Sequence, residues 1–277
     1  MKLKIYIYFC CFVAVMVAGC SKADVQPLCE DQTVTVSYCI QTPLTKAMGD
    51  GSKADYVWYA LYRFQDDSFV MECEHIQPFT DGKALCPVKM TIDQSYKVLF
   101  VAQHYEADAA GKTPTYPIDA PDATVSMPVN AVAGSENYDI FAAVDTVMHF
   151  NGSAPKSVSL KRIVSMVNFF STEDAWNSLV QKPAYCSLSI SGVPAQYNLL
   201  SGTPSNRKVT VSYQMAPIVS ETDRFLASAY CLPSGSSVDA TLDFYADSQS
   251  PYYYSQIITS IPLERNKKTQ VTGNIIN

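Results

Sequence analysis

Apolar and polar residues alternate with a period of two along most of this chain, and this pattern constrains its fold more than any other feature. In residues 33–40, Val34, Val36, Tyr38 and Ile40 alternate with Thr, Ser and Cys. Successive side chains of a β-strand point to opposite faces of a sheet, so this period, enriched in β-branched and aromatic residues, is typical of a half-buried strand. We predict a strand here.

The same reasoning predicts strands along the rest of the chain. In the first half they lie at residues 56–64, 69–74, 95–103 and 123–129, with the polar turn 65–68 joining the first two. The segment 95–103 is almost continuously apolar, which favours a strand that is buried on both faces or central in a sandwich. The second half is predicted to contain strands at 157–160, 164–170, 186–190, 208–213, 225–232, 240–245, 257–263 and 269–276.

Helical signals are nearly absent. Only residues 173–179, which follow the cap signal Ser171-Thr172, read as a helix of about two turns. Strands separated by clusters of Pro, Gly, Ser and Asp favour β-sandwiches over βαβ units. A length of 277 residues suits two domains, and residues 151–156 are the best linker. We therefore predict an all-β chain with two tandem β-sandwich domains of the immunoglobulin-like kind, at residues 31–152 and 153–277.

The first twenty residues read as an export signal. Two lysines precede an apolar stretch, and Val17-Ala18-Gly19-Cys20 follows. The last four residues resemble a bacterial lipobox, which implies a lipoprotein signal peptide at 1–19, palmitate or another acyl chain on Cys20, a short tether at 20–30 and anchoring in the outer membrane by lipid. The alternative is an ordinary secretory signal with an incidental cysteine. No other stretch is long and apolar enough to span a bilayer.

Six cysteines follow Cys20, and an exported protein is able to pair them in 15 ways. If Asp81-Gly82 forms a two-residue hairpin loop, Cys73 lies opposite Met90 and not opposite Cys86. Free buried thiols are therefore expected for several of the six. These cysteines are Cys29, Cys39, Cys73, Cys86, Cys186 and Cys231.

The composition argues against several functions. The formal charge of −6 and the absence of long basic runs disfavour a nucleic-acid partner. Three histidines offer little for a metal site or a general base. Cys73, His75 and Cys86 are too few soft ligands for a convincing metal site, and the paired Asp66-Asp67 falls in a predicted turn. No Gly-x-Ser-x-Gly motif is present. We expect no enzyme, no cofactor and no metal.

One aromatic cluster has two interpretations. Tyr252, Tyr253 and Tyr254 follow Pro251. Exposed aromatic rings stack on sugars or anchor protein partners, so these tyrosines are candidate ligand contacts. Tyrosine is also common in strands, and the three residues are equally open to a structural role.

Four blocks in order resemble the fimbrillin-like lipoproteins of Bacteroidales, which comprise the type V pilins and their accessory subunits. The blocks are residues 96–103, residues 138–142, residues 159–162 leading into 164–170, and residues 261–274. They lie behind the lipobox and span most of the mature chain. The resemblance implies two transthyretin-like β-sandwiches, export as a lipoprotein, and assembly at the cell surface by exchange of strands between subunits.

The resemblance also implies roles for particular residues. The strand with Val34, Val36, Tyr38 and Ile40 corresponds to the one that is displaced after proteolysis near the N-terminus, and a strand from residues 257–276 of a neighbour is expected to replace it. Lys46 is the candidate processing site. An arginine-specific protease would not cut there, so the alternative is that Lys46 is an ordinary loop residue.

These expectations define two functional hypotheses. The first is a stalk, tip or accessory subunit of a cell-surface fimbrium that mediates adhesion, with other fimbrial subunits and a host or bacterial receptor or glycan as partners. The second, from a different class, is a surface glycan-binding lipoprotein of a polysaccharide-uptake system, for which Tyr252, Tyr253 and Tyr254 would be the sugar contacts.

Overall fold

The protein is built almost entirely from β-strands, as predicted. The computed structural model describes residues 32–42, 51–108, 111–152, 155–218 and 224–276, and Thr33 onward forms one compact unit. The predicted signal peptide and tether lie outside the described residues. No helix in the described part of the chain is long and apolar enough to cross a membrane.

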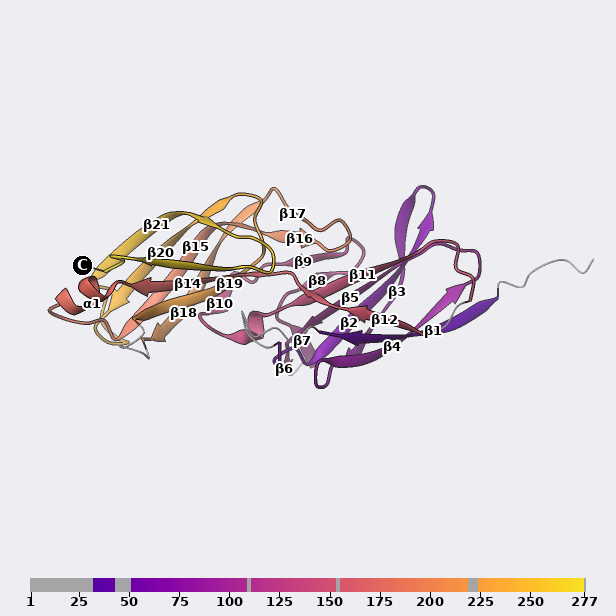
Figure 1. Ribbon diagram of the computed structural model, residues 1–277, viewed down its shortest axis with the longest axis horizontal. Coiled ribbons are helices and arrows are strands. Elements are labelled where there is room, and N and C mark those ends of the chain that lie inside the picture. Colours follow the sequence, from indigo (N-terminus) through magenta and orange to yellow (C-terminus); the bar gives the residue numbers. More distant parts are fainter. Residues whose placement is uncertain (1–31, 43–50, 109–110, 153–154, 219–223, 277) are drawn as a thin grey trace, which may run out of the picture. The chain divides into compact units, whose positions relative to one another are not determined.

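The N-terminal half forms a sandwich of two sheets (Figure 1). The smaller sheet has the order β12-β1-β4, and the larger has the order β13-β11-β5-β2-β3. Their facing sides bury one apolar cluster, which includes Tyr38, Cys86, Tyr59 and Phe100. The smaller sheet contains β1 (Thr33–Gln41), β4 (Lys83–Thr91) and β12 (Lys156–Ser159). The larger sheet contains β2 (Tyr56–Gln65), β3 (Ser68–Pro78), β5 (Tyr96–Gln103), β11 (Phe141–Val147) and β13 (Lys161–Arg162).

The strand β5 is buried on both faces, which confirms the prediction from its continuous apolar run. Val98 and Phe100 face the smaller sheet, whereas Leu99 and Val101 belong to a second apolar cluster on the opposite face. Residues 116–127 supply part of that second cluster. A strand covered on both sides has no solvent face, so its sequence loses the alternation seen in β1.

The C-terminal half forms a second pair of sheets, with the orders β10-β18-β15-β20-β21 and β19-β14-β22. Their buried side chains include Ile190, Val211, Leu242 and Phe169. The larger sheet contains β10 (Asn130–Val132), β15 (Tyr185–Pro194), β18 (Lys208–Pro217), β20 (Ser237–Tyr245) and β21 (Tyr254–Pro262). The smaller sheet contains β14 (Ser165–Ser171), β19 (Phe225–Cys231) and β22 (Lys268–Gly273).

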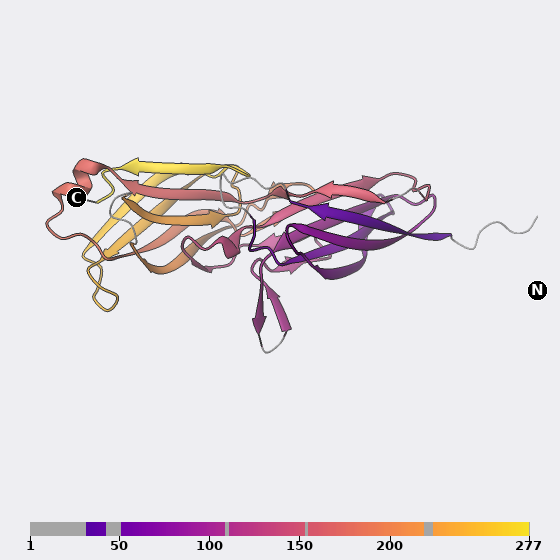
Figure 2. The ribbon, with the colours of Figure 1, turned by 60° about the horizontal axis from the view of Figure 1, so that its bottom comes forward.

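Short elements complete the structure. A small sheet consists of β8 (Ile118–Asp119), β9 (Thr124–Ser126), β16 (Gln196–Asn198) and β17 (Thr203–Pro204). The strands β6 (Tyr105–Asp108) and β7 (Gly111–Pro114) form a separate hairpin, which projects from the sheets in Figure 2. The remaining elements are the 3₁₀ turn η1 (Glu136–Tyr138) and the helix α1 (Glu173–Ser178).

The predicted helix is confirmed as α1. It is the only α-helix among the described residues. Thr172 is its N-cap, and the Thr172 hydroxyl accepts a hydrogen bond from the backbone N–H of Ala175 at 3.4 Å. This bond satisfies one of the N–H groups that the first turn of a helix leaves without a partner.

Both predicted tight turns form, but one inference drawn from them is wrong. Asp66 and Asp67 join β2 to β3 with positive φ, as do Asp81 and Gly82 between Thr80 and Lys83. The strands β3 and β4 on either side of Asp81-Gly82 belong to different sheets, however, so Cys73 lies opposite Leu61 and not opposite Met90. The expectation of free buried thiols is confirmed for Cys86, Cys186 and Cys231.

The boundary between two domains near residue 152 stays a prediction. Several strand pairs connect the segments on its two sides. β12 and β13, which follow residue 152, pair with β1 and β11, and β10, which precedes it, pairs with β18.

Candidate functional site

The strand β1 is the middle strand of its sheet (Figure 1). It pairs antiparallel with β4 over nine positions, from Thr33 opposite Thr91 to Gln41 opposite Lys83. It also pairs parallel with β12 over four positions, from Tyr38 opposite Lys156 to Gln41 opposite Ser159. The candidate displaced strand is therefore held by backbone hydrogen bonds on both sides.

The inward face of β1 is sealed in the core. Val36 is 2% exposed, and Tyr38 and Ile40 are 0% exposed, while Val34 is half-buried against the same cluster. These four side chains alternate along the strand, as the sequence predicted. They fill a groove whose other walls come from β4, β2 and β5, through Cys86, Val88, Tyr59, Val98 and Phe100. If β1 left, this groove would open to solvent.

A small polar group interrupts this apolar groove. The Tyr38 hydroxyl donates a hydrogen bond to Asp145 Oδ2 at 2.8 Å, and Lys156 Nζ lies 2.8 Å from the same oxygen. Tyr38 comes from β1, Asp145 from β11 and Lys156 from β12. Burial, together with the hydrogen bond to Asp145, raises the pKa of Tyr38 far above its ordinary value, so its hydroxyl keeps its proton and remains a donor.

The two sheets separate on the β4 side of the groove and leave a cavity of about 440 Å³. Tyr59, Cys73 and His75 line it from the larger sheet, and Thr35 and Val88 line it from the smaller one. The Tyr59 hydroxyl bridges the sheets by donating to the Pro87 carbonyl at 3.2 Å. Cys73 and His75, considered above as metal ligands, thus line one cavity wall, and the described residues contain no group of three metal-ligating side chains.

The other predicted site residues do not line the β1 groove in the described structure. Tyr252 and Tyr253 are exposed, at 56% and 44%, whereas Tyr254 opens β21 and packs on Phe244 with ring centroids 6.0 Å apart. The ring of Tyr252 stands at 82° to that of Tyr245. The three tyrosines therefore differ in environment, since Tyr252 and Tyr253 are exposed and Tyr254 is part of a strand. Cys20 and Lys46 lie outside the described residues.

Residues 257–276, the expected source of a donor strand, belong largely to the chain's own sheets. They contribute to β21 and β22, and Ile275 and Ile276 are buried. β22 pairs parallel with β14 along its whole length.

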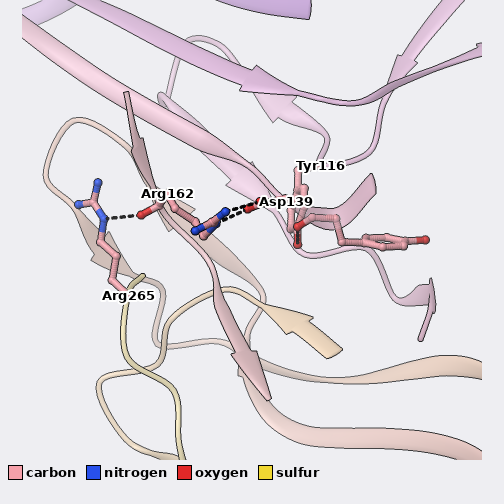
Figure 3. A network of polar contacts seen from close by, with 5 residues as sticks. Tyr116, Asp139, Arg162 and Arg265 are labelled. Carbon is pink, nitrogen blue, oxygen red and sulfur yellow. Dashed lines mark hydrogen bonds and ion pairs between the residues drawn. The ribbon is translucent and has the colours of Figure 1, made fainter. Parts of the chain in front are cut away.

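Three of the four sequence blocks that carry the resemblance contribute residues to a network around one buried ion pair (Figure 3). Arg162 donates from Nε to Asp139 Oδ1 at 2.6 Å and from Nη2 to Oδ2 at 2.7 Å. Arg265 donates from Nε to the Arg162 carbonyl at 3.4 Å. The neighbouring strand β11 pairs with both β13 and β5. Three blocks therefore have a structural role at this junction, and the fourth, residues 96–103, adjoins it through the pairing of β5 with β11.

Two important features escaped the sequence reasoning. The strand β4 was not predicted, although Ala84, Cys86, Val88 and Met90 alternate with exposed residues. The intervening Leu85 and Pro87 obscured this signal, since Pro is unusual in strands. Asp145 was not recognised as a groove residue, although it lies four positions after the buried Phe141 on β11 and therefore on the same face of the strand.

Solved structures with a similar fold come from Bacteroidales. Proteins from Bacteroides thetaiotaomicron, described as "putative polysaccharide binding proteins (DUF1812)", are 12% identical with a TM-score of 0.54, and 77% of each chain is covered. A "putative cell adhesion protein" from Parabacteroides distasonis is 8% identical with a TM-score of 0.50, covering 87% of this chain and 89% of that one. The tip fimbrial protein Mfa3 from Porphyromonas gingivalis is 10% identical, covers 83% and 82%, and has a TM-score of 0.44.

The first two of these comparisons confirm, at the level of fold, the resemblance drawn from the sequence. Among curated proteins, none matches this chain. A family model described as "Family of unknown function (DUF6562)" matches residues 29–277. The chain therefore belongs to the DUF6562 family.

Proposed function

We propose that this protein is a structural subunit of a cell-surface fimbrium and that it accepts a strand from a neighbouring subunit in the groove that β1 occupies. The observation that carries the proposal is the position of β1. It is the first strand of the described chain, yet it lies in the middle of its sheet. Its connection to β2 passes through residues 43–50, which include Lys46, so a cut there would leave β1 held by non-covalent contacts alone.

The energetics of the groove favour replacement over simple loss of β1. Departure of an edge strand exposes one row of backbone groups, but departure of β1 would expose two rows, on β4 and β12, together with the apolar groove. Unpaired backbone groups beside an apolar trough are a template for an added strand. A strand with the same alternation as Val34, Val36, Tyr38 and Ile40 would restore both.

Two further elements complete the proposal, the first from the sequence and the second from the structure. Lipid on Cys20 would carry the subunit to the outer membrane before assembly, because burial of acyl chains holds a protein at a bilayer without a spanning segment. Residues 257–276 are engaged in the chain's own second sandwich, so we assign this chain the accepting role at the β1 groove.

Cleavage at Lys46 is expected to expose the groove, and Cys86 is the natural reporter. Cys86 lies opposite Tyr38 on β4, and burial raises its pKa to about 12, so the thiol is both covered and protonated in the intact protein. After treatment with a lysine-specific protease and addition of excess partner subunit, we expect strand exchange, seen as a ladder of multimers or fibres by electron microscopy. In the cleaved protein before partner addition, we expect alkylation of Cys86 at pH 8 to accelerate at least about tenfold, measured by peptide mass spectrometry.

Internal controls separate this event from general unfolding. Cys186 and Cys231 lie in the second sandwich, and burial raises the pKa of each to about 12. Both should stay protected, and a variant with Lys46→Gln and Lys53→Gln should remain uncut between β1 and β2, with Cys86 protected. Cleaved protein that stays monomeric, with Cys86 unreactive, would contradict the proposal.

A second function is favoured by one observation, the exposure of Tyr252 and Tyr253. One structure of similar fold is described as that of "putative polysaccharide binding proteins", and exposed aromatic rings suit sugar contacts. If this chain binds glycans there, Tyr252→Ala with Tyr253→Ala should weaken retention in affinity electrophoresis at least about tenfold. Phe64→Ala, which removes an exposed aromatic residue from β2, is the matched control. Unchanged retention across a panel of bound glycans would exclude these tyrosines as the sugar site.

A further inference from the structure

Asp145 occupies a core-facing position in β11. Phe141, Ala143 and Val147 have the same parity along the strand and belong to or pack against the cluster beneath β1. A carboxylate in such a place is costly unless donors satisfy its oxygens. Its side chain is 24% exposed, so water reaches it only in part, and side chains must supply the rest.

Lys156 and Tyr38 supply these donors, and they come from different strands. Lys156 comes from β12, which remains covalently joined to the rest of the chain when β1 leaves, although β1 is its only ladder partner among the described strands. Tyr38 comes from β1 itself and would leave with it. Tyr38 and Lys156 are direct neighbours in the parallel ladder, so their side chains share the inward face, and Lys156 Nζ lies 5.9 Å from the Tyr38 ring centroid. The Tyr38 ring also packs on Phe100, with centroids 5.1 Å apart.

An empty groove would therefore contain a pocket of mixed character. Its apolar part is the space over Phe100, and its polar end is the Asp145 carboxylate, which retains Lys156 but has lost a hydroxyl donor. An aliphatic side chain or phenylalanine would cover this end without restoring the bond. Covering a carboxylate that has lost one of its two side-chain donors is unfavourable, whereas a phenol fits both parts.

We propose that Asp145 and Lys156 form the selective subsite of this groove, and that the strand it accepts carries tyrosine at the position of Tyr38. This inference rests on the proposed function. The required tyrosine pairs with Cys86 of β4 and Lys156 of β12, and apolar residues two positions before and after it replace Val36 and Ile40. Because the tyrosine is central in this pattern, the requirement is the same for a strand entering in either direction.

The subsite also bears on which subunit is the partner. Residues 257–276 of this chain contain no tyrosine. A second copy of this chain therefore offers no matching strand from that region. If the donor strand corresponds to residues 257–276, the partner is a different subunit, whose donor segment has an apolar-x-Tyr-x-apolar pattern.

Peptide exchange into the full chain tests the subsite. The protein is given a unique protease site within residues 43–50, cleaved there, and mixed with fluorescent peptides of the β1 sequence 33–41 in which Cys39 is replaced by Ser. One peptide keeps tyrosine at the position of Tyr38, and the other two carry phenylalanine or alanine. We expect the tyrosine peptide to bind about 10- to 100-fold more tightly than the phenylalanine peptide by fluorescence anisotropy.

Variants of the protein identify the source of that preference. In Asp145→Ala the preference for tyrosine over phenylalanine should fall below about twofold. Asp145→Asn keeps the side-chain volume and should also reduce this preference, so the test stands even if the alanine variant misfolds. Asp119→Ala, which removes an exposed acid from β8, should preserve it. Equal binding of the tyrosine and phenylalanine peptides to the unsubstituted protein would overturn the subsite while leaving strand acceptance intact. Failure of every peptide to enter would overturn strand acceptance itself and the subsite with it.

Discussion

Replacing Arg162 with alanine is expected to lower the free energy of unfolding by about 3–5 kcal/mol. Arg162 and Asp139 are 3% and 1% exposed, and two short hydrogen bonds join them. Without the guanidinium, the Asp139 carboxylate would remain buried with its main partner gone. The midpoint of urea unfolding, followed by tryptophan fluorescence, measures this loss.

Two comparisons test this explanation. Arg63→Ala removes a partly exposed arginine that pairs with Glu72, and the expected loss is about 1 kcal/mol or less because water screens such pairs. Arg162→Met combined with Asp139→Leu removes both charges and should recover much of the stability that Arg162→Ala loses. An Arg162→Ala protein within about 1 kcal/mol of the unsubstituted one would show that the ion pair does not stabilise the junction.

Replacing Tyr38 with alanine is expected to cost about 3–5 kcal/mol, the range for truncation of a large buried aromatic residue. The side chain is fully buried, packs on Phe100 and donates to Asp145. The loss should appear as a lower urea midpoint and as faster alkylation of Cys86, since β1 would be held less firmly over that thiol.

An exposed tyrosine provides the matched control for this change. Tyr253→Ala removes the same atoms from a surface position and should change stability by about 0.5 kcal/mol or less. If Tyr38→Ala and Tyr253→Ala had similar effects, β1 would not be anchored through its inward face, and the groove would lose its main structural support.

Much of the secondary structure follows from local patterns. Alternation predicted β1, the apolar run of β5 predicted burial on both faces, and a Ser-Thr cap predicted α1. The sequence patterns failed where local rules conflict with context. Pro87 and Leu85 obscured β4, yet Pro87 is tolerated because β4 lies at the edge of its sheet. The turn at Asp81-Gly82 is tight as expected, but it joins two sheets instead of two neighbouring strands.

The candidate site was likewise predictable from the sequence only in part. The inward residues of β1 could be named from the sequence because their spacing alone places them on one face of a strand. Asp145 could not, because a lone carboxylate in a strand gives no sign of what lies across the core. Its partner Tyr38 is 107 positions away in the chain, and only the packing of two sheets brings them together.

By itself, the sequence determined which residues of β1 share one face and that the chain is all-β, because the alternation of side chains along a strand is a local property. The tertiary structure decided that β1 lies between β4 and β12, that a carboxylate meets Tyr38 within the core, and that three separate sequence blocks converge on one buried ion pair. Strand partners are chosen by the burial of distant segments against one another, and that choice leaves no local trace in the sequence.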